Sequence, residues 1–173
     1  MADSRSEAAS ALVSVRCRLS FDVTLASNGG LKVRVVCEEA HRYIPDDKSL
    51  GFAPTRQSIA RIAKEGRKYG IYLCIISQRP GELDPTILSQ CSTVFALRLS
   101  NEADQDIIRG AISSSSASTV SFLSSIGNRE AIAFGEGIST PMRLRFSELP
   151  QEWALGHIDE PDEAGSHKNH DLE

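Results

Sequence analysis

The sequence lacks long hydrophobic runs: none of its apolar stretches approaches the roughly 18–20 residues that a helix needs to span a bilayer. The amino-terminal region carries Asp3, Arg5 and Glu7 and only a short apolar stretch, which argues against a secretory signal. Cysteines are also few, four in 173 residues, and their spacings match no zinc or redox motif. These absences argue against a membrane-spanning or disulfide-stabilised protein, and a soluble chain in a reducing cytoplasm is the expectation.

Positive charge is not in excess, because 19 Lys and Arg stand against 23 Asp and Glu, for a net charge of −4. Residues 159–173 alone carry six acids and one base, so the acidity belongs to this tail and the remainder is nearly neutral. Neither the overall charge nor the isoelectric point therefore predicts nucleic-acid binding. The length and apolar content suit one globular domain with its own core.

Apolar periodicity predicts strands that alternate with helices, which favours an α/β fold with several parallel strands. Residues 1–18 are expected to be a loosely ordered lead-in. Thr55 is expected to cap a helix that Gly70 ends, and Ser100 or Asn101 to cap a later one. The predicted strands lie at 19–25, 31–37, 71–76, 93–99, 131–134 and 142–146, and the predicted helices at 56–68, from 101 onward and just before 126.

Two adjacent carboxylates, Glu38 and Glu39, follow the apolar strand at 31–37. Open α/β sheets bind ligands at the carboxyl ends of their strands, which is where these side chains are placed. Because side chains alternate along an extended chain, the two carboxylates point in different directions and serve different purposes. One can hold a hydrated Mg²⁺, and the other can orient or deprotonate a water that attacks phosphorus.

A second group of polar residues follows the next buried strand, at 71–76. Gln78 is predicted to reach the same sheet edge, where it can touch a γ-phosphate or the attacking water. The guanidinium of Arg79 suits phosphate oxygens because it presents a rigid charged fork. An arginine placed across a subunit boundary can likewise stabilise charge on a transferring phosphoryl group.

Several uncommon strings occur in a characteristic order between residues 31 and 150. They read VRVVCEEAHRYIP, IARIAKEGRKYGIYLCIISQRPGELDPTILSQC, FALRLSNEADQDII, NREAIAFGEG and PMRLRF. In this order the chain resembles the FtsK/HerA superfamily of hexameric ATPases, and within it the bacterial HerA-like DNA translocases. The resemblance implies an α/β fold of the RecA-like P-loop NTPase type, present in part, with a mainly parallel sheet flanked by helices.

The resemblance also implies roles for individual residues. Glu38 and Glu39 look like the Walker B pair, in which Glu38 binds the metal and cofactor and Glu39 is the catalytic carboxylate. Gln78 looks like the sensor residue, and Arg67 like an arginine finger that acts on a neighbouring subunit's nucleotide. Arg79 and Arg98 are weaker alternatives for phosphate or interface contacts, and the resemblance implies that Arg79 helps to bind the cofactor.

Cofactors and partners follow from the same resemblance. The family uses ATP and Mg²⁺, and hydrolysis between subunits of a hexameric ring drives duplex DNA through it, as in DNA translocases and helicases. The implied partners are further copies of the chain or a full-length paralogue, duplex DNA and a nuclease, with no membrane involved.

Two departures from the family stand out. Glu38 occupies a position where the family usually has Asp, so its carboxylate sits one methylene further out. The sequence also contains no G-x-x-x-x-G-K-[ST] phosphate-binding loop. The chain therefore looks like the C-terminal half of such an ATPase domain, at 31–150, between an unmatched lead-in at 1–30 and a C-terminal segment with an acidic tail at 151–173. We expect such a chain to bind ATP weakly and not to hydrolyse it alone.

Other interpretations stay open at this point. The chain could be a non-catalytic module that docks on a full-length HerA-like ATPase, or an inert product with an exposed sheet edge. Arg67 could simply be the cationic end of a helix. His41 is expected to be a local hydrogen-bond partner of the acidic pair, and Trp153 to pack the C-terminal segment onto the body or a neighbouring subunit.

Overall fold

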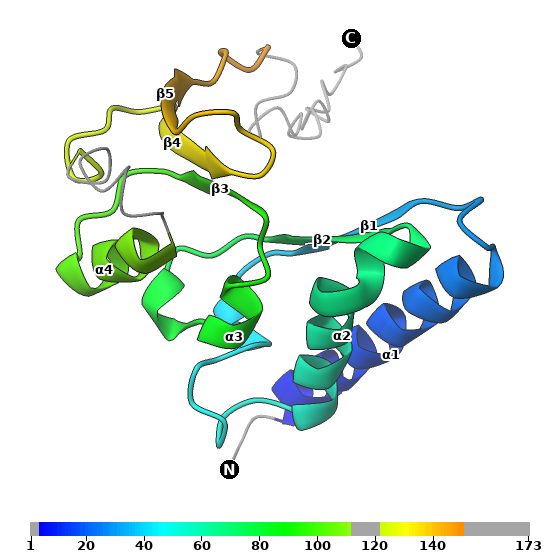
Figure 1. Ribbon diagram of the computed structural model, residues 1–173. Helices are drawn as coiled ribbons and strands as arrows, with labels where there is room; N and C mark the ends of the chain where they lie inside the picture. Colours follow the sequence, from blue (N-terminus) through cyan, green and yellow to red (C-terminus); the bar gives the residue numbers. More distant parts are fainter. Residues whose placement is uncertain (1–3, 112–121, 151–173) are drawn as a thin grey trace, which may run out of the picture.

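The computed structural model describes residues 4–111 and 122–150 of the chain (Figure 1). Along the chain lie α1 (Ser4–Ala26), β1 (Val33–Cys37), η1 (Ala40–Arg42), α2 (Ala53–Tyr69), β2 (Ile71–Ile75), η2 (Pro80–Glu82), α3 (Pro85–Leu88), β3 (Thr93–Ala96), α4 (Glu102–Ala111), β4 (Glu130–Gly135) and β5 (Met142–Arg145). The helix expected just before 126 falls largely outside the described residues, and Trp153 and the acidic tail lie wholly outside them. No helix of the described part is long and apolar enough to cross a membrane.

The strands form two sheets. β1 and β2 pair in parallel, with Val33 opposite Ile71 and Cys37 opposite Ile75. β3, β4 and β5 form an antiparallel sheet in that order. The fold is therefore mixed α/β, and the expectation of a mainly parallel sheet is wrong for the described residues. One reason lies in the connection from β4 to β5, which is far shorter than the dozen or more residues that a parallel crossover needs.

The amino-terminal region is a long helix, α1, which corrects both expectations for it. Residues 1–18 are not a loose lead-in as far as the structure describes them, and 19–25 is not a strand. The residues that α1 buries are Ser10, Cys17, Phe21 and Thr24, whose spacings of seven, four and three place them on one face of a helix.

Helices α1 and α2 pack against each other along this face. The Phe21 ring meets Tyr69 edge-on at a centroid distance of 5.4 Å, and the Arg61 guanidinium carbon lies 4.0 Å from the Phe21 centroid. The buried Thr55 hydroxyl donates a hydrogen bond of 2.6 Å to the backbone carbonyl of Ser10. Thr55 therefore does not cap α2 as expected, because its hydroxyl joins the two helices instead, and Phe52 is the cap residue.

Gly70 ends α2, as the sequence predicts. It adopts a left-handed conformation with φ of 86°, and its amide donates to the carbonyl of Gly66. A Cβ at this position would lie 2.7 Å from the backbone oxygen of Leu31, so only glycine fits. This turn brings β2 directly beside β1, which sets the register of the parallel pair.

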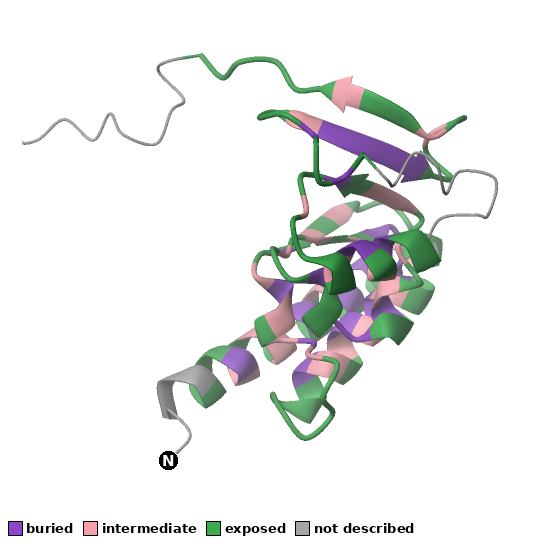
Figure 2. Cartoon of the chain, turned by 90° about the vertical axis from the view of Figure 1, so that its left-hand side faces the viewer, coloured by how far each residue is buried: buried purple, intermediate pink, exposed green. Residues whose placement is uncertain are grey.

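The core has two parts. One cluster lies between α1, α2, α3 and one face of the parallel pair, and includes Phe21, Ile59, Ile62 and Ile71. The other lies between β3, β4 and α4. The second face of the parallel pair stays exposed, as Figure 2 shows for much of this region, and it carries Arg34, Val36, Tyr72, Cys74 and Ile76.

Thiol labelling tests this packing. Burial raises the pKa of the Cys37 thiol to about 12, with smaller contributions from the neighbouring thiols of Cys17 and Cys74. Burial also raises the pKa of Cys17, whereas Cys74 is exposed. Because the thiolate is the reactive form, we expect iodoacetamide to label Cys74 first near neutral pH, and to label Cys37 and Cys17 only after denaturation. Peptide mass mapping measures this order, and equal labelling rates for Cys37 and Cys74 would contradict it.

Candidate active site at the carboxyl edge of the parallel strands

Glu38 and Glu39 lie where β1 ends. Strand-like pairing continues beyond the last residue of β1, because the Ile76 amide donates to the Cys37 carbonyl at 2.9 Å and the Ala40 amide donates to the Ile76 carbonyl at 3.0 Å. Glu39 adopts a left-handed conformation, with φ of 49° and ψ of 48°, and precedes the short helix η1. Glu38 is exposed and Glu39 is half-buried, so the two carboxylates occupy different environments.

The Glu39 carboxylate is held by groups from both strand ends. The Gln78 side-chain amide donates to Glu39 Oε1 at 3.1 Å, and His41 Nδ1 lies 3.4 Å from Glu39 Oε2. The Ser77 hydroxyl lies 3.4 Å from the same His41 nitrogen. We call Glu39, His41, Ser77 and Gln78 the edge cluster. Its geometry places Gln78 beside Glu39 and His41 as a local partner, as the sequence predicts.

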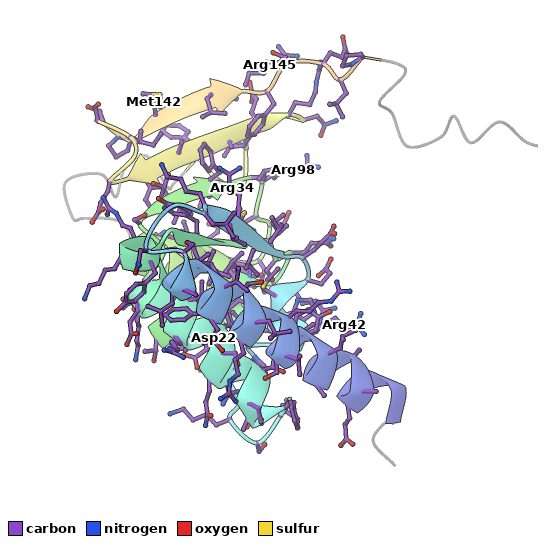
Figure 3. All side chains as sticks on the ribbon, turned by 90° about the vertical axis from the view of Figure 1, so that its right-hand side faces the viewer. Asp22, Arg34, Arg42, Arg98, Met142 and Arg145 are labelled. Carbon is purple, nitrogen blue, oxygen red and sulfur yellow. The ribbon has the colours of Figure 1, made fainter. Side chains whose placement is uncertain are left out.

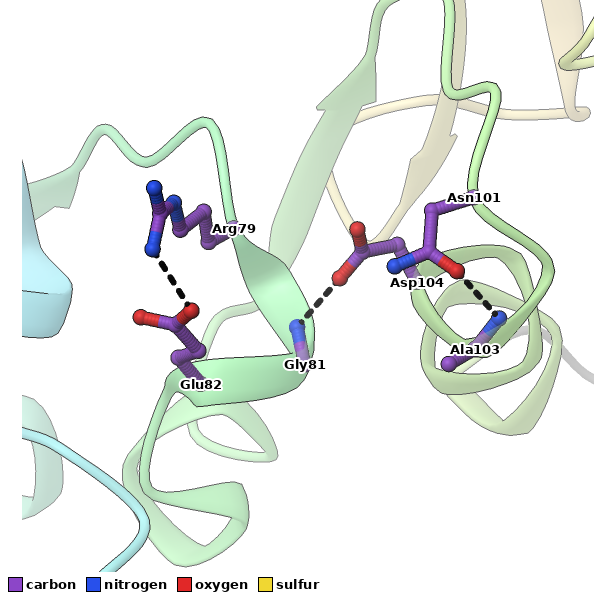
Figure 4. A pocket seen from close by; sticks show the side chains of 6 residues that line it. All are labelled: Arg79, Gly81, Glu82, Asn101, Ala103 and Asp104. Atoms are coloured by element: carbon purple, nitrogen blue, oxygen red, sulfur yellow. Dashed lines mark hydrogen bonds and ion pairs between the residues drawn. The ribbon is translucent and has the colours of Figure 1, made fainter.

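Arg79 does not reach the edge cluster. Its guanidinium donates to Glu82 Oε1 at 2.9 Å, within the same short helical turn. Both residues line a cleft of about 450 Å³ together with Gly81, Asn101, Ala103 and Asp104 (Figure 4). This cleft lies between η2, which follows β2, and the start of α4, which follows β3.

Two hydrogen bonds fix the side of the cleft that the start of α4 forms. Asp104 accepts a hydrogen bond of 2.8 Å from the Gly81 amide, so it joins α4 to η2. Asn101 accepts from the Ala103 amide at 3.1 Å and caps α4, as expected. Asp104 could not be identified from the sequence as a partner of Gly81. The two residues are 23 positions apart along the chain, and no known motif links residues at that spacing.

Arg67 lies at the opposite end of β2 from the edge cluster. It belongs to the last turn of α2, directly before β2, and its guanidinium pairs with the exposed Glu136 at 3.2 Å. β2 has five residues and therefore separates Arg67 from Gln78 by roughly 16 Å. Arg67 thus cannot contact a group that Glu39 contacts in the same chain.

Arg98, the other arginine considered from the sequence, is exposed and follows β3. In Figure 3 it lies at a level between Arg34 on β1 and Arg145 on β5.

A protein-only metal cage is absent from residues 4–111 and 122–150, where no three His, Cys, Asp or Glu side chains group together. A single exposed carboxylate such as Glu38 still fits Mg²⁺, because this ion keeps several waters and is held by one or two carboxylates together with substrate phosphates. The donor set is therefore compatible with a metal that arrives with a nucleotide.

Comparison with curated proteins shows clear relatives. The DNA double-strand break repair helicase HerA of Pyrococcus furiosus is 36% identical over 120 residues, which cover 68% of this chain and 21% of the relative. The corresponding HerA of Saccharolobus solfataricus is 33% identical over 127 residues, covering 72% of this chain and 25% of that protein. The chain is related to the HerA helicases. It spans between a fifth and a quarter of the length of these two relatives, and no protein-family model matches it.

Comparison with solved structures shows a similarity in fold. The genome packaging NTPase B204 of Sulfolobus turreted icosahedral virus 2 superposes with a TM-score of 0.57 at 14% identity, over 75% of this chain and 62% of that one. That NTPase was solved in complex with ATP-γS. The chain thus resembles part of this NTPase at the level of the fold.

Proposed function

We propose that residues 31–150 supply the catalytic carboxylate and the sensor side chain of an ATP-hydrolysing site in a HerA-like DNA translocase. The observation that carries this proposal is the 3.1 Å hydrogen bond between Gln78 and Glu39 at the carboxyl edge of two parallel strands. This is the edge at which open α/β sheets bind their ligands. Relationship to HerA helicases over two-thirds of the chain supports the same conclusion.

The edge cluster can prepare a water for attack. A carboxylate only accepts hydrogen bonds, so the nitrogen of the Gln78 amide must face Glu39, which leaves the amide oxygen to accept from a water. Glu39 Oε1 and the Gln78 oxygen can then hold the two protons of one water molecule. Glu39 takes one proton as the water oxygen bonds to the terminal phosphorus and the bond from that phosphorus to the departing ADP breaks. His41 keeps the carboxylate in position from its other oxygen.

Glu38 is the residue we assign to Mg²⁺. When bound, the ion neutralises charge on the β- and γ-phosphate oxygens. Glu38 lies next to the catalytic carboxylate but in solvent, where a hydrated ion can reach it. Its extra methylene relative to aspartate moves the carboxylate outward, which suits contact through the ion's water shell.

Arg67 would act on the site of a neighbouring subunit. Its separation from Gln78 by the length of β2 prevents it from serving its own chain, whereas a ring arrangement places one subunit's exposed arginine beside the next subunit's nucleotide. We therefore propose a hexameric ring of this chain or a paralogue, which moves duplex DNA and works with a nuclease. The alternative is a non-catalytic module that docks on a full-length HerA-like ATPase, which the absence of a G-x-x-x-x-G-K-[ST] string in these residues favours.

A graft tests the proposed role. Residues 31–150 replace the corresponding region of the Pyrococcus furiosus helicase, which is 36% identical to this chain over 120 residues. We expect the grafted protein to hydrolyse Mg·ATP, and the 173-residue chain alone to show no turnover. Phosphate release measures both. A folded but inactive graft would contradict the catalytic role, and turnover by the chain alone that disappears in Glu39→Gln would overturn the expectation of inactivity.

A further inference from the structure

The longest helix, α1, lies at the surface of the molecule and is covered on one side only. Figure 1 shows it at the right-hand edge of the described part, and Figure 3, viewed from that side, shows it in front. Its inner face packs on α2, whereas Leu12, Val15, Leu19 and Val23 on the opposite face are each more than half exposed. Together with Ala26, which is also exposed, these residues form what we call the outer stripe.

The outer stripe follows one face of the helix over most of its length. Its members are three, four, four and three residues apart, so they lie along one line that is about 21 Å long. Single exposed apolar residues are ordinary on protein surfaces, but a contiguous row of them marks a surface that contacts another group. The outer stripe therefore indicates an interaction along one side of α1.

The spacing of the outer stripe is symmetric about Leu19. A two-fold axis through that point places a second copy of α1 alongside the first, running in the opposite direction. Leu19 then meets Leu19 of the second copy, Val15 meets Val23, and Leu12 meets Ala26, because the members of each pair are equally far from the centre. The outer stripe is therefore complementary to itself in the antiparallel orientation.

The charged residues beside the outer stripe fit the same orientation. Arg18 and Asp22 border one side of the stripe, and neither forms an ion pair within the described part of the chain. Across the two-fold axis, Asp22 lies at a level about 3 Å from that of Arg18 of the second copy, which the long arginine side chain can reach. The symmetry produces this contact twice. Arg16 borders the other side, where about 9 Å along the helix separates it from its own copy.

The same charges disfavour a parallel pair. Two parallel copies in register bring opposite sides of the outer stripe together, so Arg16 of one copy lies beside Arg18 of the other at nearly the same level. Like charges at this separation repel, and the symmetry repeats the contact. Antiparallel helices also place opposite ends of their dipoles side by side. The charge pattern therefore favours the antiparallel orientation.

We propose that two copies of the chain associate through their outer stripes, packed antiparallel about a two-fold axis at Leu19. This contact closes on two chains, so it is distinct from the head-to-tail contact of a ring and does not depend on ATP hydrolysis. A single pair of helices buries less than the roughly 1,200 Å² at which standard interfaces begin, so we expect a reversible dimer with a Kd on the order of 0.1 mM.

Sedimentation equilibrium of the full chain measures the association, over concentrations from about tenfold below to about tenfold above the expected Kd. Leu19→Lys places two ammonium groups at the axis and should weaken association by at least about tenfold. Leu50→Lys is the matched control, because Leu50 is similarly exposed but lies in the loop before α2. Both positions are at the surface, so neither variant should unfold the monomer, which the urea midpoint of the dilute protein checks.

A charge exchange tests the predicted ion pairs. Arg18→Asp makes one side of the outer stripe acidic and Asp22→Arg makes it basic, so each variant should associate with itself more weakly than the natural chain does. An equal mixture should form a heterodimer in preference to either homodimer, since every charged pair across the axis is then opposite in sign. Sedimentation of one fluorescently labelled variant in the presence of the other measures this preference.

Disulfide trapping tests the position of the axis, in a background in which the exposed Cys74 is replaced by Cys74→Ser. We expect Leu19→Cys to cross-link to itself under oxidised glutathione, and Val15→Cys to cross-link to Val23→Cys in a mixture, because a disulfide needs Cα atoms within about 7 Å. Val15→Cys alone should cross-link little, since about 12 Å along the helix separates it from its own copy.

Several results would overturn the proposal. A chain that stays monomeric at the highest concentration, or equal weakening by Leu19→Lys and Leu50→Lys, would show that the outer stripe is not the contact. Self-cross-linking of Val15→Cys and Val23→Cys as readily as of Leu19→Cys would show parallel packing. Dimerisation only after removal of residues 151–173 would show that this segment of the same chain covers the outer stripe.

Discussion

Replacing Glu39 by glutamine in the grafted ATPase should lower kcat by about 10²–10⁴-fold, the range expected when a general base is lost. Glutamine keeps the shape of the side chain and can still meet Gln78, but it cannot take a proton from water. The KM for ATP should change little, because the proposed partner of Glu39 is the attacking water and not the phosphates that bind in the ground state. Steady-state hydrolysis at varied ATP concentration measures both constants.

Two further variants of the graft make this result specific. Glu38→Asp shortens the carboxylate that we assign to Mg²⁺ and should preserve turnover, since the charge remains. Arg67→Ala should be inactive by itself, but an equal mixture with Glu39→Gln subunits should recover about a quarter of the activity if the arginine acts on a neighbour's site. An undiminished kcat in Glu39→Gln, or a mixture that stays inactive although both variants assemble, would contradict the respective role.

Replacing Phe21 by alanine should destabilise the chain by about 3–5 kcal/mol, the usual cost of removing a buried aromatic ring. Phe21 is 1% exposed, packs edge-on against Tyr69 and lies under the Arg61 guanidinium, so its loss leaves a cavity between α1 and α2. The midpoint of urea unfolding, followed by circular dichroism, measures the change in the free energy of unfolding.

Leu19→Ala is the matched control on the same helix. Leu19 is 58% exposed, so its truncation should change the free energy of unfolding by less than about 0.5 kcal/mol. A strand at 19–25 would place Leu19 and Phe21 on one buried face and make the two variants similarly destabilising. Comparable losses in the two variants would therefore contradict the packing of α1.

The sequence was most informative where chain order and apolar runs alone decide the structure. Two apolar strands joined by a helix predict a parallel pair, and a parallel pair brings both carboxyl ends to one edge. This is why the placement of Gln78 beside Glu39 could be predicted before any coordinates. Gly70 was equally predictable, because only a residue that tolerates a positive φ can end a helix in so short a connection to a strand.

The prediction of a strand at 19–25 was wrong because α1 is apolar on two sides. Leu12, Val15, Leu19 and Val23 are exposed and form a second stripe opposite the buried one. Together the two stripes put apolar residues at alternate positions from 19 to 25, which imitates the period of a strand. The local pattern of apolar residues cannot distinguish a helix from a strand at residues 19–25. Packing against α2 favours the helix.

The pairing of β3 with β4 was also beyond local inference. The strands are far apart along the chain, and apolar alternation carries no information on direction. Arg79 shows the reverse situation, because its partner Glu82 is three residues away, a spacing at which side chains on a helical turn meet. A pair so close in sequence could have been proposed at the outset, and it would have moved Arg79 away from the edge cluster.

The backbone of Glu39 has a consequence for how this protein can change. A residue other than glycine, asparagine or aspartate in the left-handed region is held there at a cost of about 1 kcal/mol or more. Glycine and asparagine would relieve that strain but could not accept a proton. Selection for thermal tolerance would therefore favour at position 39 replacements that remove the proposed catalytic carboxylate. If glutamate is kept at this position in a lineage, this would indicate selection for the chemical role of its carboxylate and not for the stability of the fold.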